Sequence, residues 1–204
     1  MRISALHLTL PVVAVALLAG CSSPAAPVSS PTASPTVSPT SSPTPTASPA
    51  PTGGSEVDPN APDGQCADAD LSVDIAADPG GAGAGSVPYV ITFTNSGPEC
   101  VLEGAPGVSV RGDNDSSQIG EPAEQQGTAT PVTLSTGGTA VAALTVVNIG
   151  TDGGPLGSAC KVTAGEGYRV YAPHSFEPVF VKSSGVAACS SSSDFMQVGT
   201  VTAG

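Results

Sequence analysis

Very few side chains in this chain of 204 residues are placed to do acid–base or nucleophilic chemistry. Its two histidines are His7, in an apolar N-terminal stretch, and His174, in the sequence APHSFEP. A Ser–His–acid triad built on His174 needs an activated serine, yet no serine lies in a G-x-S-x-G motif. We therefore interpret His174 as a surface turn residue, and we predict no catalytic residues, no cofactor and no enzymatic activity.

A second group of candidate residues lies in the sequence RGDNDSS. Asp113 and Asp115 offer oxygen ligands of the kind that calcium accepts. The stretch lacks the remaining acids and the terminal glutamate of a calcium loop, so we expect a solvated turn and no metal site. The same stretch contains Arg111-Gly112-Asp113, the tripeptide that integrin ligands display on loops, and we interpret it as a chance occurrence.

Nothing in the sequence predicts the binding of phosphate groups or nucleic acid. The chain has 17 Asp and Glu against 5 Lys and Arg, a formal net charge of -12. A surface that binds nucleic acid needs clustered Lys and Arg, so this partner class is excluded. The glycine-rich sequence GGAGAG at 80–85 lacks the G-K-[ST] ending of a phosphate loop and precedes no helix, which predicts a hairpin loop.

The first 20 residues have the features of an export signal. Arg2 is followed by an apolar stretch in which Pro11 leaves an uninterrupted run only at 12–19. That run is too short to cross about 30 Å of hydrocarbon. A positive start, a short apolar core and small residues before a cleavage point predict a secretory signal peptide over residues 1–20.

The end of this signal resembles the lipobox of bacterial lipoproteins. Leu18, Ala19 and Gly20 fill its recognition positions, and Cys21 fills the position that receives a diacylglycerol. The resemblance implies cleavage between Gly20 and Cys21 and a lipid anchor on Cys21 at the outer face of the cytoplasmic membrane. Two acyl chains are enough for stable membrane attachment. The alternative is a plain secretory signal followed by an accidental cysteine.

Residues 22–52 contain prolines every two to four positions among Ser, Thr and Ala, with no charge and no aromatic residue. Such a composition cannot form a core and favours extended polyproline II. We therefore predict that residues 21–64 hold the lipidated cysteine and a disordered Pro/Ser/Thr-rich tether. This tether would carry the following domain into the cell wall.

The remainder, residues 65–204, alternates short apolar segments with turn residues. Period-two alternation, β-branched residues and Gly, Pro, Asn or Asp boundaries predict β-strands. Eight to nine such strands predict an all-β fold, a β-sandwich. The predicted strands are 71–75, 87–94, 100–103, 108–111, 131–134, 140–149, 167–172, 177–182 and 196–202.

Four cysteines remain once Cys21 is assigned to the lipid, and three disulfide connectivities are open to them. Antiparallel pairing of the first two strands places Cys66 and Cys100 at the same end of the sheet. A similar hairpin argument places Cys160 next to Cys189. We predict these two disulfides, which suit an exported protein. Zinc binding is the alternative, but no two of these cysteines are close neighbours in the sequence.

Two blocks of sequence, YVITFTNSGPECVLEGAPGVSV and VTLSTGGTAVAAL, with the order of cysteines around them, resemble the actinobacterial domain of unknown function 4232. The resemblance covers residues 66 to about 202. It implies an exported immunoglobulin-like β-sandwich and no catalytic residues. We interpret Asn95 and Gly97 as turn residues that tolerate positive φ, and Phe93, Leu102 and Val108 as core.

These observations predict a lipid-anchored protein of the cell envelope. Its expected role is binding or interaction, with an envelope protein or a cell-wall ligand as the partner. The second hypothesis is a structural or spacer protein of the cell wall. An enzyme is the third, and it lacks a convergent nucleophile, base and orienting group.

Overall fold

The computed structural model of the chain describes residues 58–81, 83, 85–191 and 193–204. The predicted signal peptide, Cys21 and most of the predicted tether lie outside these residues. The last part of that predicted tether, residues 58–64, forms turns in which the Ala61 amide donates to the Asp58 carbonyl. None of the helices in the described ranges is both long and apolar enough to span a membrane.

The described residues form twelve strands and two short 3-10 helices, so the prediction of an all-β fold is confirmed. The helices are η1 (Asp68–Asp70) and η2 (Gly154–Ala159). The strands are β1 (Leu71–Ala77), β2 (Ser86–Asn95), β3 (Cys100–Leu102), β4 (Gly107–Gly112), β5 (Ser117–Ile119), β6 (Glu124–Gln126), β7 (Val132–Leu134), β8 (Thr139–Val147), β9 (Val162–Tyr171), β10 (Pro178–Cys189), β11 (Met196–Gly199) and β12 (Thr202–Ala203).

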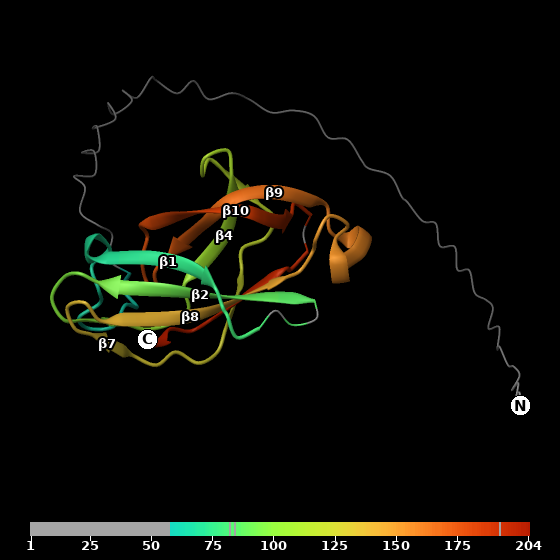
Figure 1. Cartoon of the computed structure of the whole chain (residues 1–204). Helices are drawn as coiled ribbons and strands as arrows, with labels where there is room; N and C mark the ends of the chain where they lie inside the picture. The colour runs from blue at the N-terminus through green and yellow to red at the C-terminus, as the bar shows by residue number, and fades with distance from the viewer. Residues whose placement is uncertain (1–57, 82, 84, 192) are drawn as a thin grey trace, which may run out of the picture. The chain divides into compact units, whose positions relative to one another are not determined.

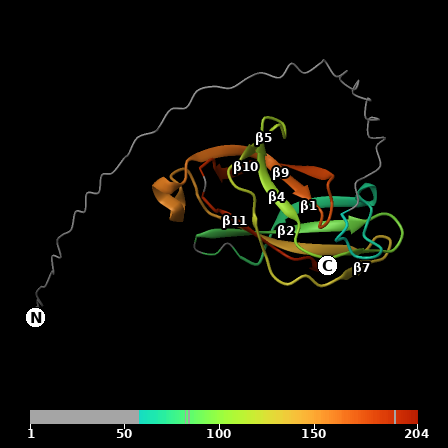
Figure 2. The same ribbon diagram turned by 180° about the vertical axis from the view of Figure 1, so that it is seen from behind.

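These strands build two main sheets that pack face to face as a sandwich (Figure 1). The larger sheet has the order β1-β2-β8-β11-β6, with β12 beside β8, and the other has the order β10-β9-β4-β5. Strands β3 and β7 pair separately, and the view from behind shows β7 at the same edge as the C-terminus (Figure 2). Every pairing is antiparallel except that of β6 with β11.

One apolar layer between the sheets holds the sandwich together. Strand alternation places every second side chain on the inner face, and β8 follows it strictly. The buried residues of β8 are Ala140, Ala142, Leu144 and Val146. The predicted core residues Phe93, Leu102 and Val108 are all buried, at 0%, 0% and 2% exposure. The small alanines of β8 let the bulky side chains of the facing sheet pack closely.

The strand count exceeds the predicted eight to nine because short polar strands carry no apolar alternation. β5 and β6 were not predicted, and all three residues of β6 are exposed. β9 and β10 extend beyond their predicted segments into sequence rich in glycine and serine. The predicted strand 196–202 is divided between β11 and β12.

The four cysteines are joined as predicted from the hairpin geometry. Cys66 precedes β1 and Cys100 begins β3, and their Cα atoms are 4.8 Å apart. Cys160 precedes β9 and Cys189 ends β10, with Cα atoms 5.0 Å apart. Each disulfide closes a loop of about 30 residues, which restricts the unfolded chain.

Asn95 has a different role from the one expected. It is the last residue of β2, lies opposite Leu71 in the β ladder, and is not among the residues with positive φ. Its side chain is fully buried, and its Nδ2 donates to the carbonyl oxygens of Pro98 at 2.7 Å and Leu134 at 3.2 Å. Its Oδ1 accepts the amide of Gly97 at 2.9 Å. The carboxamide therefore joins the turn after β2 to the end of β7.

Gly97 also departs from the expectation of a positive φ. A Cβ atom at this position would collide with the carboxylate of Asp70, which lies at the end of η1. The glycine is needed here for close approach of two chain segments.

We predict that Asn95→Ala lowers the free energy of unfolding by about 2–4 kcal/mol, because it removes a buried side chain and leaves the buried Leu134 carbonyl and the partly buried groups of Gly97 and Pro98 without this partner. Urea unfolding followed by circular dichroism measures the change. Asn60→Ala is the matched control, since Asn60 is exposed and its amide binds only the nearby Asp58. Equal stability of the two variants would contradict the assigned role of Asn95.

Candidate functional site

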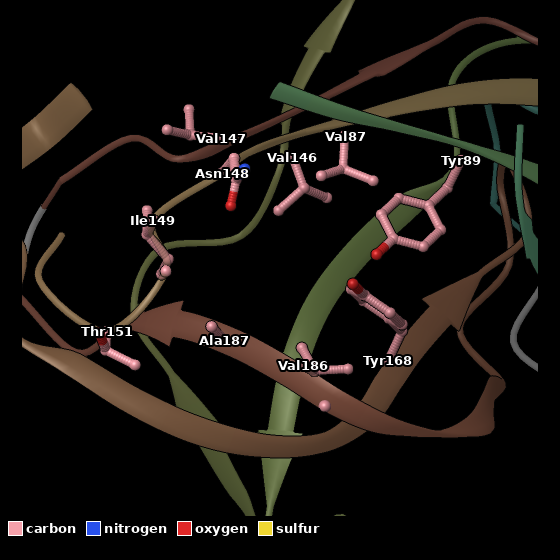
Figure 3. A pocket seen from close by; sticks show the side chains of 12 residues that line it. Val87, Tyr89, Val146, Val147, Asn148, Ile149, Thr151, Tyr168, Val186 and Ala187 are labelled. Carbon is pink, nitrogen blue, oxygen red and sulfur yellow. The ribbon is translucent and has the colours of Figure 1, made fainter. Parts of the chain in front are cut away.

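A cavity of about 340 Å³ lies between the two sheets at one end of the sandwich (Figure 3). One wall comes from β2 and β8, and the other comes from β9 and β10. The loop that follows β8 closes the side. The lining residues are Val87, Tyr89, Val146, Val147, Asn148, Ile149, Gly150, Thr151, Tyr168, Gly185, Val186 and Ala187.

An irregularity in β10 shapes the mouth of this cavity. The pairing of β10 with β9 runs regularly to Lys182 and resumes only at Val186, so three residues of β10 oppose one of β9. Such an insertion bends the strand and increases its local twist. Gly185 takes a φ of 76°, a conformation that favours glycine. The residues that follow the irregularity then line the cavity.

Two tyrosines, one from each sheet, form the polar end of the cavity. Tyr89 projects from β2 and Tyr168 from β9, and their ring centroids are 6.1 Å apart with the planes inclined by 55°. Figure 3 shows the two hydroxyl groups directed toward each other. Tyr168 is only 2% exposed, and this burial raises the pKa of its hydroxyl well above 10. The facing hydroxyl of Tyr89 raises that pKa further, so Tyr168 stays protonated and neutral.

The rest of the lining is uncharged. No Asp, Glu, Lys, Arg or His is among the twelve lining residues. Valines and Ile149 supply apolar walls, while Asn148 and Thr151 lie across the cavity from the tyrosines (Figure 3). The cavity is open to solvent on one side, and it combines apolar walls with a few polar groups, as small-molecule sites do.

His174 lies in a turn, as predicted, but it is only partly exposed and has a specific partner. Its Nδ1 lies 2.9 Å from Oδ2 of Asp58, a residue 116 positions away in the sequence. His174 adopts a φ of 59°, in the left-handed region of the backbone. Among the described residues no hydroxyl group hydrogen-bonds to the ring, so this His–Asp pair has no nucleophile beside it.

Asp115 was expected to lie in a solvated turn, but its carboxylate is paired with two arginines. Its Oδ1 accepts from Nε of Arg169 at 2.9 Å and from Nε of Arg111 at 3.2 Å. Its backbone carbonyl accepts from both guanidinium groups. Arg169 is the largest of the interactions that lower the pKa of Asp115. A carboxylate engaged in this way is not available to a metal ion.

The same contacts explain why the Arg-Gly-Asp sequence is not displayed. Arg111 is 8% exposed, because it lies on β4 beneath Asp115, and Gly112 is buried. Only Asp113 of the three is exposed. The arginine is therefore unavailable to an external receptor. In the described ranges no three His, Cys, Asp or Glu residues gather as they would around a metal.

The sequence analysis did not identify the cavity. Its tyrosines lie on strands of different sheets, and alternation alone marks them as inward-facing core residues. The glycine–serine sequence at 183–185 was the available signal, because it interrupts an apolar strand pattern. The predicted loop at 80–85 connects β1 to β2. Residues 82 and 84 of this loop lie outside the part of the chain that the structure describes.

Residues 66–202 match the family model described as a domain of unknown function (DUF4232). No curated protein and no solved structure matches the chain.

We predict that the carboxyl group of Asp58 titrates below 3.8, because the Asn60 amide and His174 hydrogen-bond to its charged form. The folded-state pKa is the lower one, so this contribution to stability is present at neutral pH and is lost as the pH falls through that pKa. The measurement is a titration of the Asp58 carboxyl carbon by NMR.

In the variant His174→Asn the pKa of Asp58 should rise toward 3.8 without reaching it, since the Asn60 hydrogen bond remains. Asparagine tolerates the left-handed backbone at this position. Ser175→Ala serves as the control and should leave the titration unchanged. Identical curves for all three proteins would show that His174 does not interact with Asp58.

Proposed function

The chain belongs to the DUF4232 family, and we propose that this member is a lipid-anchored binding module of the cell envelope. Cys21 would carry the lipid at the outer face of the cytoplasmic membrane. The Pro/Ser/Thr-rich sequence would then extend the β-sandwich away from that membrane. The binding site would be the cavity between the sheets.

The anchor is supported by the sequence at the end of the apolar N-terminal stretch. Leu18-Ala19-Gly20-Cys21 has the residues of a lipobox, and it directly precedes the proline-rich segment. The two disulfides of the domain support export, because disulfides form and persist in oxidising compartments. Assigning Cys21 to a lipid also accounts for the odd cysteine.

The single observation that favours binding is the cavity. A spacer gains nothing from an opening in its core, because each lost apolar contact lowers stability. Here the two sheets leave about 340 Å³ open at one end and place two tyrosine hydroxyls within it. A spacer of the cell wall is the alternative, and it would not need this arrangement. An enzyme is less favoured, because the His174–Asp58 pair has no nucleophile beside it among the described residues.

We predict that Cys21→Ala moves the protein from the membrane fraction to the soluble fraction, because the acyl chains would have no thiol to join. Cell fractionation and immunoblotting measure the distribution. Cys160→Ala combined with Cys189→Ala is the control, since it removes a disulfide and leaves Cys21 in place. A Cys21→Ala protein that stays with the membrane would contradict the anchor.

We also predict that the protein isolated from its own cells carries an additional small molecule, seen by native mass spectrometry as non-covalent mass that denaturation removes and that exceeds the mass of the lipidated, two-disulfide chain. Val87→Phe should remove that mass, because Val87 lines the cavity and a larger ring would fill it. Val90→Phe is the matched control, since Val90 lies on the opposite face of the same strand. A wild-type protein that shows no mass beyond that of its lipidated chain would contradict the binding role.

A further inference from the structure

We infer that the cavity takes an uncharged, mostly apolar molecule of one or two rings that presents a hydroxyl or carbonyl oxygen to the tyrosine pair. This inference rests on the proposed binding function and specifies the class of ligand. Four properties of the cavity carry it: charge, walls, polar end and size.

The charge of the lining excludes ionic ligands. None of the twelve lining residues bears a charge, and the pKa of Tyr168 is raised, so that its hydroxyl remains neutral. A carboxylate, phosphate or ammonium group placed against this lining would lose part of its water without gaining an opposite charge. The ligand must therefore be neutral at the pH of its environment.

The walls favour an apolar body. Val87 and Val146 face the cavity from β2 and β8, and Val186 faces it from β10 (Figure 3). Ile149 closes the side after β8. Burial of apolar ligand surface against these side chains supplies the main driving force for binding.

The polar end selects a single oxygen. Each tyrosine hydroxyl offers one donor and two acceptor sites, and even a bond between the two hydroxyls would use only one of the donors. In the described part of the chain neither hydroxyl has a polar partner other than the facing one. One O–H group is therefore left for an acceptor on the ligand. A ligand without that acceptor leaves the donor unpaired in a buried site, which costs affinity.

The volume of the cavity limits the class of ligand further. About 340 Å³ lies near the lower end of the range of small-molecule pockets, roughly 300–1,000 Å³. A molecule of one or two rings fills this space, whereas a long acyl chain does not fit within it. The polar side chains of Asn148 and Thr151 lie opposite the tyrosines (Figure 3), where a second polar group of the ligand could meet them.

The test uses the complete chain and four probes that share one ring system: 2-naphthol, naphthalene, 2-naphthoate and the cation 2-naphthylmethylammonium. The protein contains no tryptophan, so the fluorescence of the probes is measured without that background. We expect 2-naphthol to bind about five- to tenfold more tightly than naphthalene, because it accepts the free hydrogen bond. Both charged probes should bind the cavity roughly tenfold or more weakly than 2-naphthol. The cation matters because the acidic chain attracts it, so its weak binding cannot come from repulsion.

The variants test the role of the tyrosines. Tyr89→Phe combined with Tyr168→Phe should abolish the preference for 2-naphthol over naphthalene while keeping the binding of both. Tyr171→Phe is the matched control, because Tyr171 is the third tyrosine and does not line the cavity. Val87→Phe should prevent binding of every probe, which shows that the signal comes from this cavity.

Three results would overturn the inference. They are a charged probe that binds as tightly as 2-naphthol, a preference for 2-naphthol that survives the double tyrosine variant, and no binding of 2-naphthol. The proposed function fails separately, in native mass spectrometry of the protein from its own cells. A retained molecule that Val87→Phe removes, together with no binding of 2-naphthol, would keep the binding role and reject only this ligand class.

Discussion

The buried carboxamide of Asn95 is the polar contact on which the arrangement of this sandwich depends. Its side chain bonds to Gly97 and Pro98 in the turn after β2, to Leu134 at the end of β7 and to Ser135 just beyond it. The backbone of Asn95 adds bonds to Gly137 and Gly138 in the turn before β8. Because β2 and β8 are also paired along nine residues, this end of the larger sheet is held rigidly. The Cys66–Cys100 disulfide restrains the same end.

The cavity lies at the opposite end of the sandwich, where the described residues include no buried carboxamide like that of Asn95. The irregularity of β10 takes residues 183–185 out of the regular ladder, and the loop after β8 departs from the sheet at Asn148. A fold that is fixed firmly at one end can tolerate separation of its sheets at the other, because the cost of lost packing is confined to a few residues. The open end is therefore where a site is least costly to build.

The sequence predicts those features of the fold that depend on neighbouring residues, and it does not predict contacts between residues far apart in the chain. β2 and β8 were predicted because their segments are rich in β-branched residues and are bounded by turn residues, and the disulfides followed from hairpin pairing of neighbouring strands. β6 was missed because its residues are all polar, and its strand conformation comes only from pairing with β11. The His174–Asp58 and Arg169–Asp115 contacts join residues far apart in the chain, so no spacing rule could identify them. Tyr89 and Tyr168 face one another for the same reason, as products of how the two sheets are stacked.

The chain is strongly acidic, but the lining of its cavity is uncharged. The chain has a net charge of -12, whereas the cavity lining has none. A field of this kind acts on charged molecules over about a Debye length, roughly 8 Å at physiological ionic strength, and does not steer a neutral molecule. The acidic surface thus adds nothing to the affinity for an uncharged ligand, while it disfavours the approach of anions. Selection among neutral molecules is then left to the apolar walls and to the one hydrogen bond that the tyrosine pair can still make.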